Sequence, residues 1–147
     1  MATFTSVITE SFTGDTGTIN STNTKTISGI NDVTKYVVGV KNGVVTTLAH
    51  FAAGTHTSAG AHNVANVKYV RVTNMGSANV SIGIIGAATC HNIILGADES
   101  HIIGLVDDVY LAEDDVDPSH ASHADIATIE AKSTSGVQQV EIVIAST

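Results

Sequence analysis

Hydrophobic and polar positions alternate along this chain in short runs rather than in helical periods. In Val137–Ala145, the residues Val140, Ile142 and Ile144 share one face, and the opposite face is mostly polar. An alternation of period two is typical of a strand in a sheet with one buried side. Asn66–Gly104 contains further runs rich in Val and Ile, each ended by turn residues. The pattern therefore predicts consecutive antiparallel strands joined by tight turns.

The predicted strands along the chain are Lys35–Lys41, Val44–Phe51, Val67–Thr73, Ala78–Ile85, His91–Leu95, Glu99–Ile103, Leu105–Leu111, Asp125–Lys132 and Val137–Ala145. Asn42-Gly43 favours a type I′ turn, which predicts a hairpin between the first two. A final hairpin is predicted around the turn Ser133–Gly136. Roughly eight to ten short strands indicate an all-β fold, an antiparallel β-sandwich of jelly-roll-like form. An alternative over His120–Ala131 is a short helix.

The first thirty residues differ from the rest in having few apolar positions. Thr3–Thr13 alternates loosely and predicts a strand closed by the turn Gly14–Gly17. Thr18–Ser28 is rich in Thr and Asn, with Ile19 and Ile27 as its apolar anchors, and is interpreted as a loop with a short edge strand. We expect one domain over residues 1–147, with residues 1–30 as an N-terminal arm.

Composition and charge narrow the functional classes. The chain has 18 Val and 15 Ile against 4 Leu, a balance that favours strands over helices. Its formal net charge is −8 with only six Lys or Arg. So few cations can neutralise few phosphates, which argues against binding to nucleic acid or to an anionic membrane surface.

Cysteine content and targeting signals point to a reducing compartment. Cys90 is the only cysteine, so no disulfide can form within the chain. The sequence contains no run of about 18 apolar residues, so it predicts no transmembrane helix. The N-terminal sequence lacks the features of a secretory signal. We expect the chain to fold in a reducing cytoplasm, where a lone Cys among small apolar residues is a buried hydrophobe.

Two patterns are candidates for metal binding. His120, His123 and Asp125 lie close together in sequence, and imidazole and carboxylate suit Zn or Mn. The acidic stretch Asp114–Asp117 offers carboxylates that suit Ca²⁺, although the EF-hand spacing is absent. Surface histidines and a solvated acidic loop are the alternative interpretation. We assign neither a metal nor a cofactor to these residues.

The catalytic patterns that sequence can reveal are missing. Ser100 and His101 are neighbours on a predicted strand, so they point to opposite faces and cannot act as nucleophile and base; Asp98 precedes them in a turn. The G-x-S-x-G motif and the glycine-rich nucleotide-binding motifs are also absent. The sequence thus predicts no enzyme and no catalytic residue.

The middle third of the chain resembles small structural proteins from the virions of tailed bacteriophages. The resemblance rests on the strand–turn–strand phrase Tyr69–Ile82 and on the turn phrase Ile94–His101. It implies a β-sandwich protein at the capsid surface, a decoration or cement protein that bridges capsomers. The implied partners are the major capsid protein and further copies of the chain, as a homo-oligomer and specifically a trimer. No binding residue of the family can be matched to a position here.

Two other functions fit the same sequence. One is a tail or fibre component that binds a host receptor or a glycan, although the chain has only three Tyr and three Phe to stack on sugars. The other is a metal-dependent enzyme on a jelly-roll scaffold that uses some of the seven histidines. Edge strands, the N-terminal arm and outward-facing valines such as Val37, Val40 and Val44 are expected to make the contacts between subunits.

Overall fold

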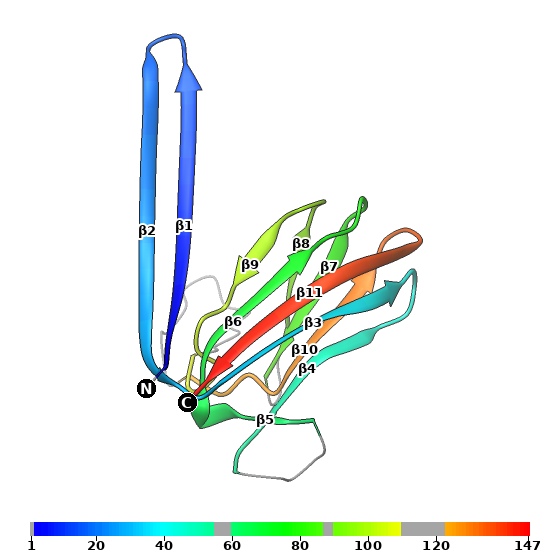
Figure 1. The fold of residues 1–147 in the computed structure, drawn as a ribbon. Helices are drawn as coiled ribbons and strands as arrows, with labels where there is room; N and C mark the ends of the chain where they lie inside the picture. The colour runs from blue at the N-terminus through cyan, green and yellow to red at the C-terminus, as the bar shows by residue number, and fades with distance from the viewer. Residues whose placement is uncertain (1, 55–59, 87–89, 110–122) are drawn as a thin grey trace.

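The computed structural model describes residues 2–54, 60–86, 90–109 and 123–147, which form a β-sandwich and a separate two-stranded hairpin (Figure 1). The hairpin consists of β1 (Ala2–Gly14) and β2 (Gly17–Ile30). One sheet has the order β3 (Asp32–Lys41), β11 (Val137–Ser146), β6 (Val67–Asn74) and β9 (Ser100–Ile102). The other has the order β5 (His62–Asn63), β4 (Thr46–Ala52), β10 (Thr128–Ser133), β7 (Val80–Ile85) and β8 (Cys90–Leu95). A 3₁₀ turn, η1 (Val64–Asn66), precedes β6.

The expected antiparallel β-sandwich is confirmed, and its strand order is that of a jelly roll. Apart from the two-residue β5, eight strands form two sets of four. Each pair of strands in one sheet leads along the chain into a pair in the other sheet. The pair β3–β11 leads into β4–β10, and the pair β6–β9 leads into β7–β8. The chain is thus two long antiparallel ribbons rolled so that each contributes to both sheets.

In this topology neither of the two predicted hairpins is formed. The strands on either side of Asn42-Gly43 belong to different sheets, and so do the strands flanking Ser133–Gly136. Gly43 does have a positive φ, as expected, but the turn carries the chain across the sandwich. The chain crosses because both strands bury apolar side chains in the same core. Val40 before the turn and Leu48 after it both face this core, so the two strands lie on opposite sides of it. The Tyr36 hydroxyl donates a hydrogen bond to the Leu48 carbonyl across this gap.

Two further predictions about single elements are wrong. Thr18–Ser28 is not a loop, because it lies within β2 and pairs along its length with β1. In the described part of Leu105–Leu111 there is no strand: the backbone bends at Asp107 and Asp108, and Asp108 has a φ of 48°. The helix considered over His120–Ala131 is replaced at its end by β10; residues 120–122 lie outside the described ranges.

The core is built from small branched side chains, as the composition predicts. Val70, Val72, Ile82, Ile129 and Ile142 are among its fully enclosed members and come from both sheets. Val40, which was expected on an outer face, belongs to this core. Within the described ranges, no helix has the length and apolar character needed to cross a bilayer.

A buried polar hub holds the turn between β6 and β7. The Asn74 side chain is fully enclosed; its amide nitrogen lies 2.8–3.1 Å from the carbonyls of Ala78, Leu95 and Gly96, and its oxygen accepts a hydrogen bond from the Gly76 amide. Gln138 of β11 accepts from two further amides of the same turn. A Cβ at Gly76 would collide with the Gln138 side chain, so this turn requires glycine.

Candidate functional site

The hairpin of β1 and β2, here called the arm, stands away from the sandwich and has two chemically different faces (Figure 1). Thirteen residue pairs join its strands. Alternation places one set of side chains on what we call the apolar face: Phe4, Ser6, Ile8, Glu10, Phe12, Ile19, Ser21, Asn23, Lys25 and Ile27. The opposite face is almost entirely Thr, Ser and Asn, with Val7 as its single large apolar side chain. The arm is therefore amphipathic.

At its base, the apolar face packs on the outside of the four-stranded sheet. Phe4 and Ile27 contact a small cluster of Ile30, Tyr69 and Ala145, separate from the main core. The rings of Phe4 and Tyr69 lie 4.8 Å apart between centroids. The Tyr69 hydroxyl also lies 3.2 Å from the Ser6 hydroxyl. These contacts fix the direction in which the arm leaves the sandwich.

Beyond the base, the same apolar face has no cover. Phe12 is 63% exposed and Ile19, its cross-strand partner, is 69% exposed. Among the described residues, neither strand pairs with a second neighbour, so these residues leave backbone N–H and C=O groups along both edges of the arm open to pairing. An isolated two-stranded hairpin is at best marginally stable in water. The distal arm therefore has the properties of a segment that is completed by another surface.

A groove lies where the arm meets the sandwich. It has a volume of about 380 Å³ and runs between Ser6–Thr9 of β1 and the side chains of Tyr69, Arg71, Ser100 and Ile102. Its walls mix apolar and hydroxyl-bearing side chains around one guanidinium group. The groove opens onto the exposed side of the four-stranded sheet, here called the outer sheet face.

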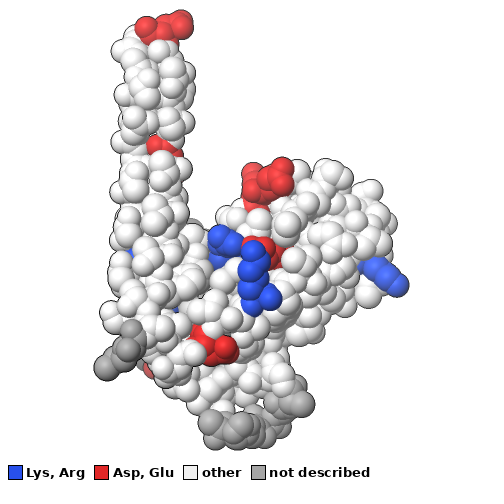
Figure 2. All heavy atoms as spheres, in the orientation of Figure 1, with Lys and Arg blue, Asp and Glu red and all other residues white. Residues whose placement is uncertain are grey.

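An ion-pair triad lies at the centre of the outer sheet face. The Glu141 carboxylate is 2.9 Å from Lys35 Nζ and 2.6 Å from Arg71 Nη2, which come from the two flanking strands. Hydrogen bonds from Lys35 and Arg71 hold the pKa of Glu141 below its ordinary value of 4.5, although its burial acts in the opposite direction. Figure 2 shows cationic side chains gathered in the middle of this view of the sandwich, with acidic side chains beside them.

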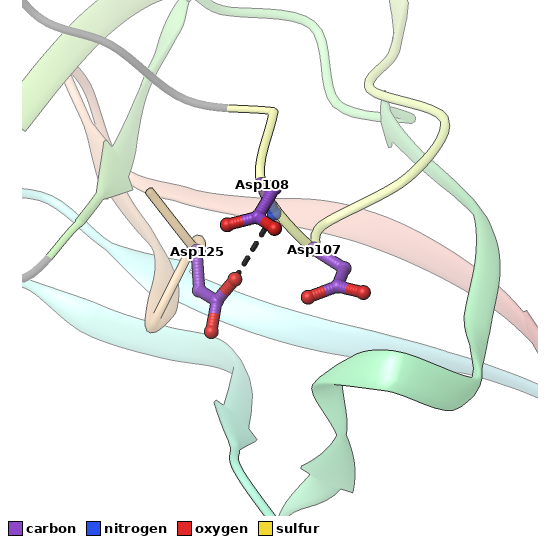
Figure 3. A group of neighbouring side chains, drawn as sticks. All are labelled: Asp107, Asp108 and Asp125. Carbon is purple, nitrogen blue, oxygen red and sulfur yellow. Dashed lines mark hydrogen bonds between the residues drawn. The ribbon is translucent and has the colours of Figure 1, made fainter. Parts of the chain in front are cut away.

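A second candidate is a group of three carboxylates on the sandwich (Figure 3). Asp107, Asp108 and Asp125 each offer an oxygen, and these oxygens lie within 4.8 Å of one another. The Asp108 amide donates a hydrogen bond of 3.0 Å to Asp125 Oδ1, which holds the two loops together. Partial desolvation and the Asp125 carboxyl raise the pKa of Asp107 above its ordinary value. Such oxygens suit a hard divalent cation such as Ca²⁺.

This group overlaps only partly with the metal ligands considered from sequence. Asp125 belongs to it, whereas His123 is exposed and is not among its members; His120 lies outside the described residues, as does Asp114–Asp117. Asp107 and Asp108 were assigned to a strand, which would have separated their side chains. The bend at Asp108 is what brings them to Asp125.

The remaining candidate residues are not assembled into a reactive group. Ser100 points to the outer sheet face, where its hydroxyl lies 2.7 Å from that of Thr73, while His101 occupies the alternate position on β9. Burial and the neighbouring His91 lower the pKa of His101. Cys90 is exposed rather than buried, so the expectation of a buried hydrophobe is wrong.

Comparison with models of protein families, with curated proteins and with solved structures found no match for this chain.

Proposed function

We propose that this protein is a structural component of a virus particle, specifically a decoration or cement protein that stabilises a phage capsid by contacts between capsomers. The observation that carries the proposal is the arm. Among the described residues, an amphipathic hairpin leaves a compact jelly roll with the distal part of its apolar face exposed and its two edges unpaired, which suits adhesion between subunits rather than chemistry.

The rest of the molecule supports an adhesive role. The sandwich is a stiff body of Val and Ile, and Ser100 and His101 lie on opposite faces of β9. The proposed mechanism is burial of apolar area together with backbone hydrogen bonds along the arm and the sheet edges. The major capsid protein is the partner in this proposal, and the capsid surface is the location.

The test is binding to assembled shells of the major capsid protein from the same source. Wild-type protein is mixed with undecorated shells, and bound copies are counted by quantitative mass spectrometry after sedimentation. We expect saturation at a number that matches the capsomers and a higher unfolding temperature for the shells. A copy number that matches a tail or its fibres would instead place the protein there, and no association with shells or tails would refute the proposal.

A further inference from the structure

We propose that the distal half of the arm docks on the outer sheet face of a second copy of this chain, in a reciprocal assembly in which every copy gives and receives an arm. This inference rests on the proposed adhesive role of the arm and names its occupant. It starts from the continuity of the apolar face: Phe4 and Ile27 are covered by the chain's own sheet, whereas Ile8, Phe12 and Ile19 are not.

The outer sheet face offers a surface of the same kind as the one that already holds the base of the arm. The base packs at the end of this face around Tyr69 and Ala145. The remainder of the face exposes valines on one edge strand and one central strand: Val33 and Val37 on β3, and Val137 on β11. An arm from another copy would extend the packing that the chain's own arm begins.

Charge favours the outer sheet face over another arm as the surface on which the arm docks. Register places Lys35, Lys41 and Arg71 on the outer sheet face, where Glu141 is the facing anion. Half of the six cations in a chain of net charge −8 therefore lie on one face. Glu10 is the one charged residue on the distal apolar face of the arm, between Ile8 and Phe12. The distal apolar face of another arm would offer Glu10 no cation, whereas the outer sheet face offers it cationic partners.

Area indicates why the exchange must be reciprocal. The eight residue pairs from Val7–Thr24 to Gly14–Gly17 make the distal arm. At strand dimensions it is about 26 Å long and about 10 Å wide, so one face covers about 260 Å². One docked arm buries about 500 Å² over both partners, less than the roughly 1,000 Å² that a stable interface requires. Two exchanged arms reach about 1,000 Å², so closure is needed for stability.

The first experiment is sedimentation velocity of the full chain at micromolar concentration. We expect a closed oligomer in the wild type and at least about a hundredfold weaker association in a Phe12→Ser, Ile19→Ser variant, because both large apolar side chains lose their burial. Ile94→Ser is the matched control, since Ile94 is 65% exposed on the other sheet. A monomeric wild type, or equal loss in the control, would overturn the inference.

The second experiment identifies the two surfaces by exchange of charge. Glu10→Lys and Lys35→Glu are each expected to weaken self-association by about tenfold or more. Mixing the two variants should restore it, because each arm then finds an opposite charge on the other copy. Thermal unfolding confirms that both variants are folded. Two folded variants that self-associate like the wild type, or that stay apart when mixed, would refute docking at this face.

The outcomes also distinguish this inference from the proposed function. A monomer that still saturates capsid shells would refute arm exchange between copies and leave the decoration role standing. An arm-exchanged oligomer with no affinity for shells or tails would refute the decoration role and leave arm exchange between copies standing.

Discussion

Replacement of the buried Asn74 by alanine tests how the two sheets are held together at the turn between β6 and β7. Its amide has two hydrogens for three nearby carbonyls, and its oxygen accepts one further hydrogen bond, so the variant loses three hydrogen bonds. At about 1 kcal/mol for each, the free energy of unfolding should fall by about 3 kcal/mol. For a chain of this size the melting temperature should then fall by about 6–12 °C.

Asn79→Ala is the control for this prediction. Asn79 lies five positions away in the same turn, but it is exposed, and only its backbone carbonyl is used, by Thr134. Its replacement should change the free energy of unfolding by less than about 0.5 kcal/mol. Urea unfolding of both variants and the wild type, read by circular dichroism, gives the three values. A loss below about 1 kcal/mol at Asn74, or equal losses at the two sites, would show that the hub does not hold the turn.

Three further predictions concern pH. The pKa of Glu141 is depressed in the fold, so its ion pairs stabilise the fold above its ordinary pKa of 4.5. This stability is lost as the pH falls through the folded pKa of Glu141. Glu141→Gln should lack this acid-dependent loss in urea titrations between about pH 3 and pH 7. The lowered pKa of His101 favours the neutral ring in the fold, so stability should decline as the pH falls below 6.5, and His101→Gln should flatten that decline in thermal melts. The raised pKa of Asp107 means that its ionisation opposes folding, so Asp107→Asn should raise the melting temperature at neutral pH, with a gain that disappears below pH 3.8; a lower melting temperature at neutral pH would contradict this.

The alternation of side chains predicted the strands well but not which strands pair. The apolar positions around Asn42-Gly43 correctly marked two strands with buried faces. A hairpin in one sheet and a crossing between two sheets bury the same residues, so local sequence does not distinguish them. The long-range pairs, such as Val140 with Val38 and Asn74, decide the topology.

The candidate sites were predicted to different extents. Residues 1–30 were expected to form an arm, and the second strand of the hairpin in this region was interpreted as a loop because Thr and Asn side chains in a solvated strand resemble those of a loop. The carboxylate group was missed because it depends on the backbone bend at Asp108, with a left-handed conformation that aspartate tolerates. The pair of adjacent aspartates, Asp107 and Asp108, was the available signal, because aspartate favours turns.

The meeting of the two chain ends makes the arm a transferable module. Ala2 pairs with Ile30, and the Asn31 amide donates a hydrogen bond to the Ser146 carbonyl, so both ends lie at the foot of the arm (Figure 1). A short linker from Thr147 to Ala2, with the chain reopened before Asp32, would place the arm after the sandwich in the sequence without moving it in space. The order of arm and sandwich in the sequence is therefore free to vary, while their geometry is not.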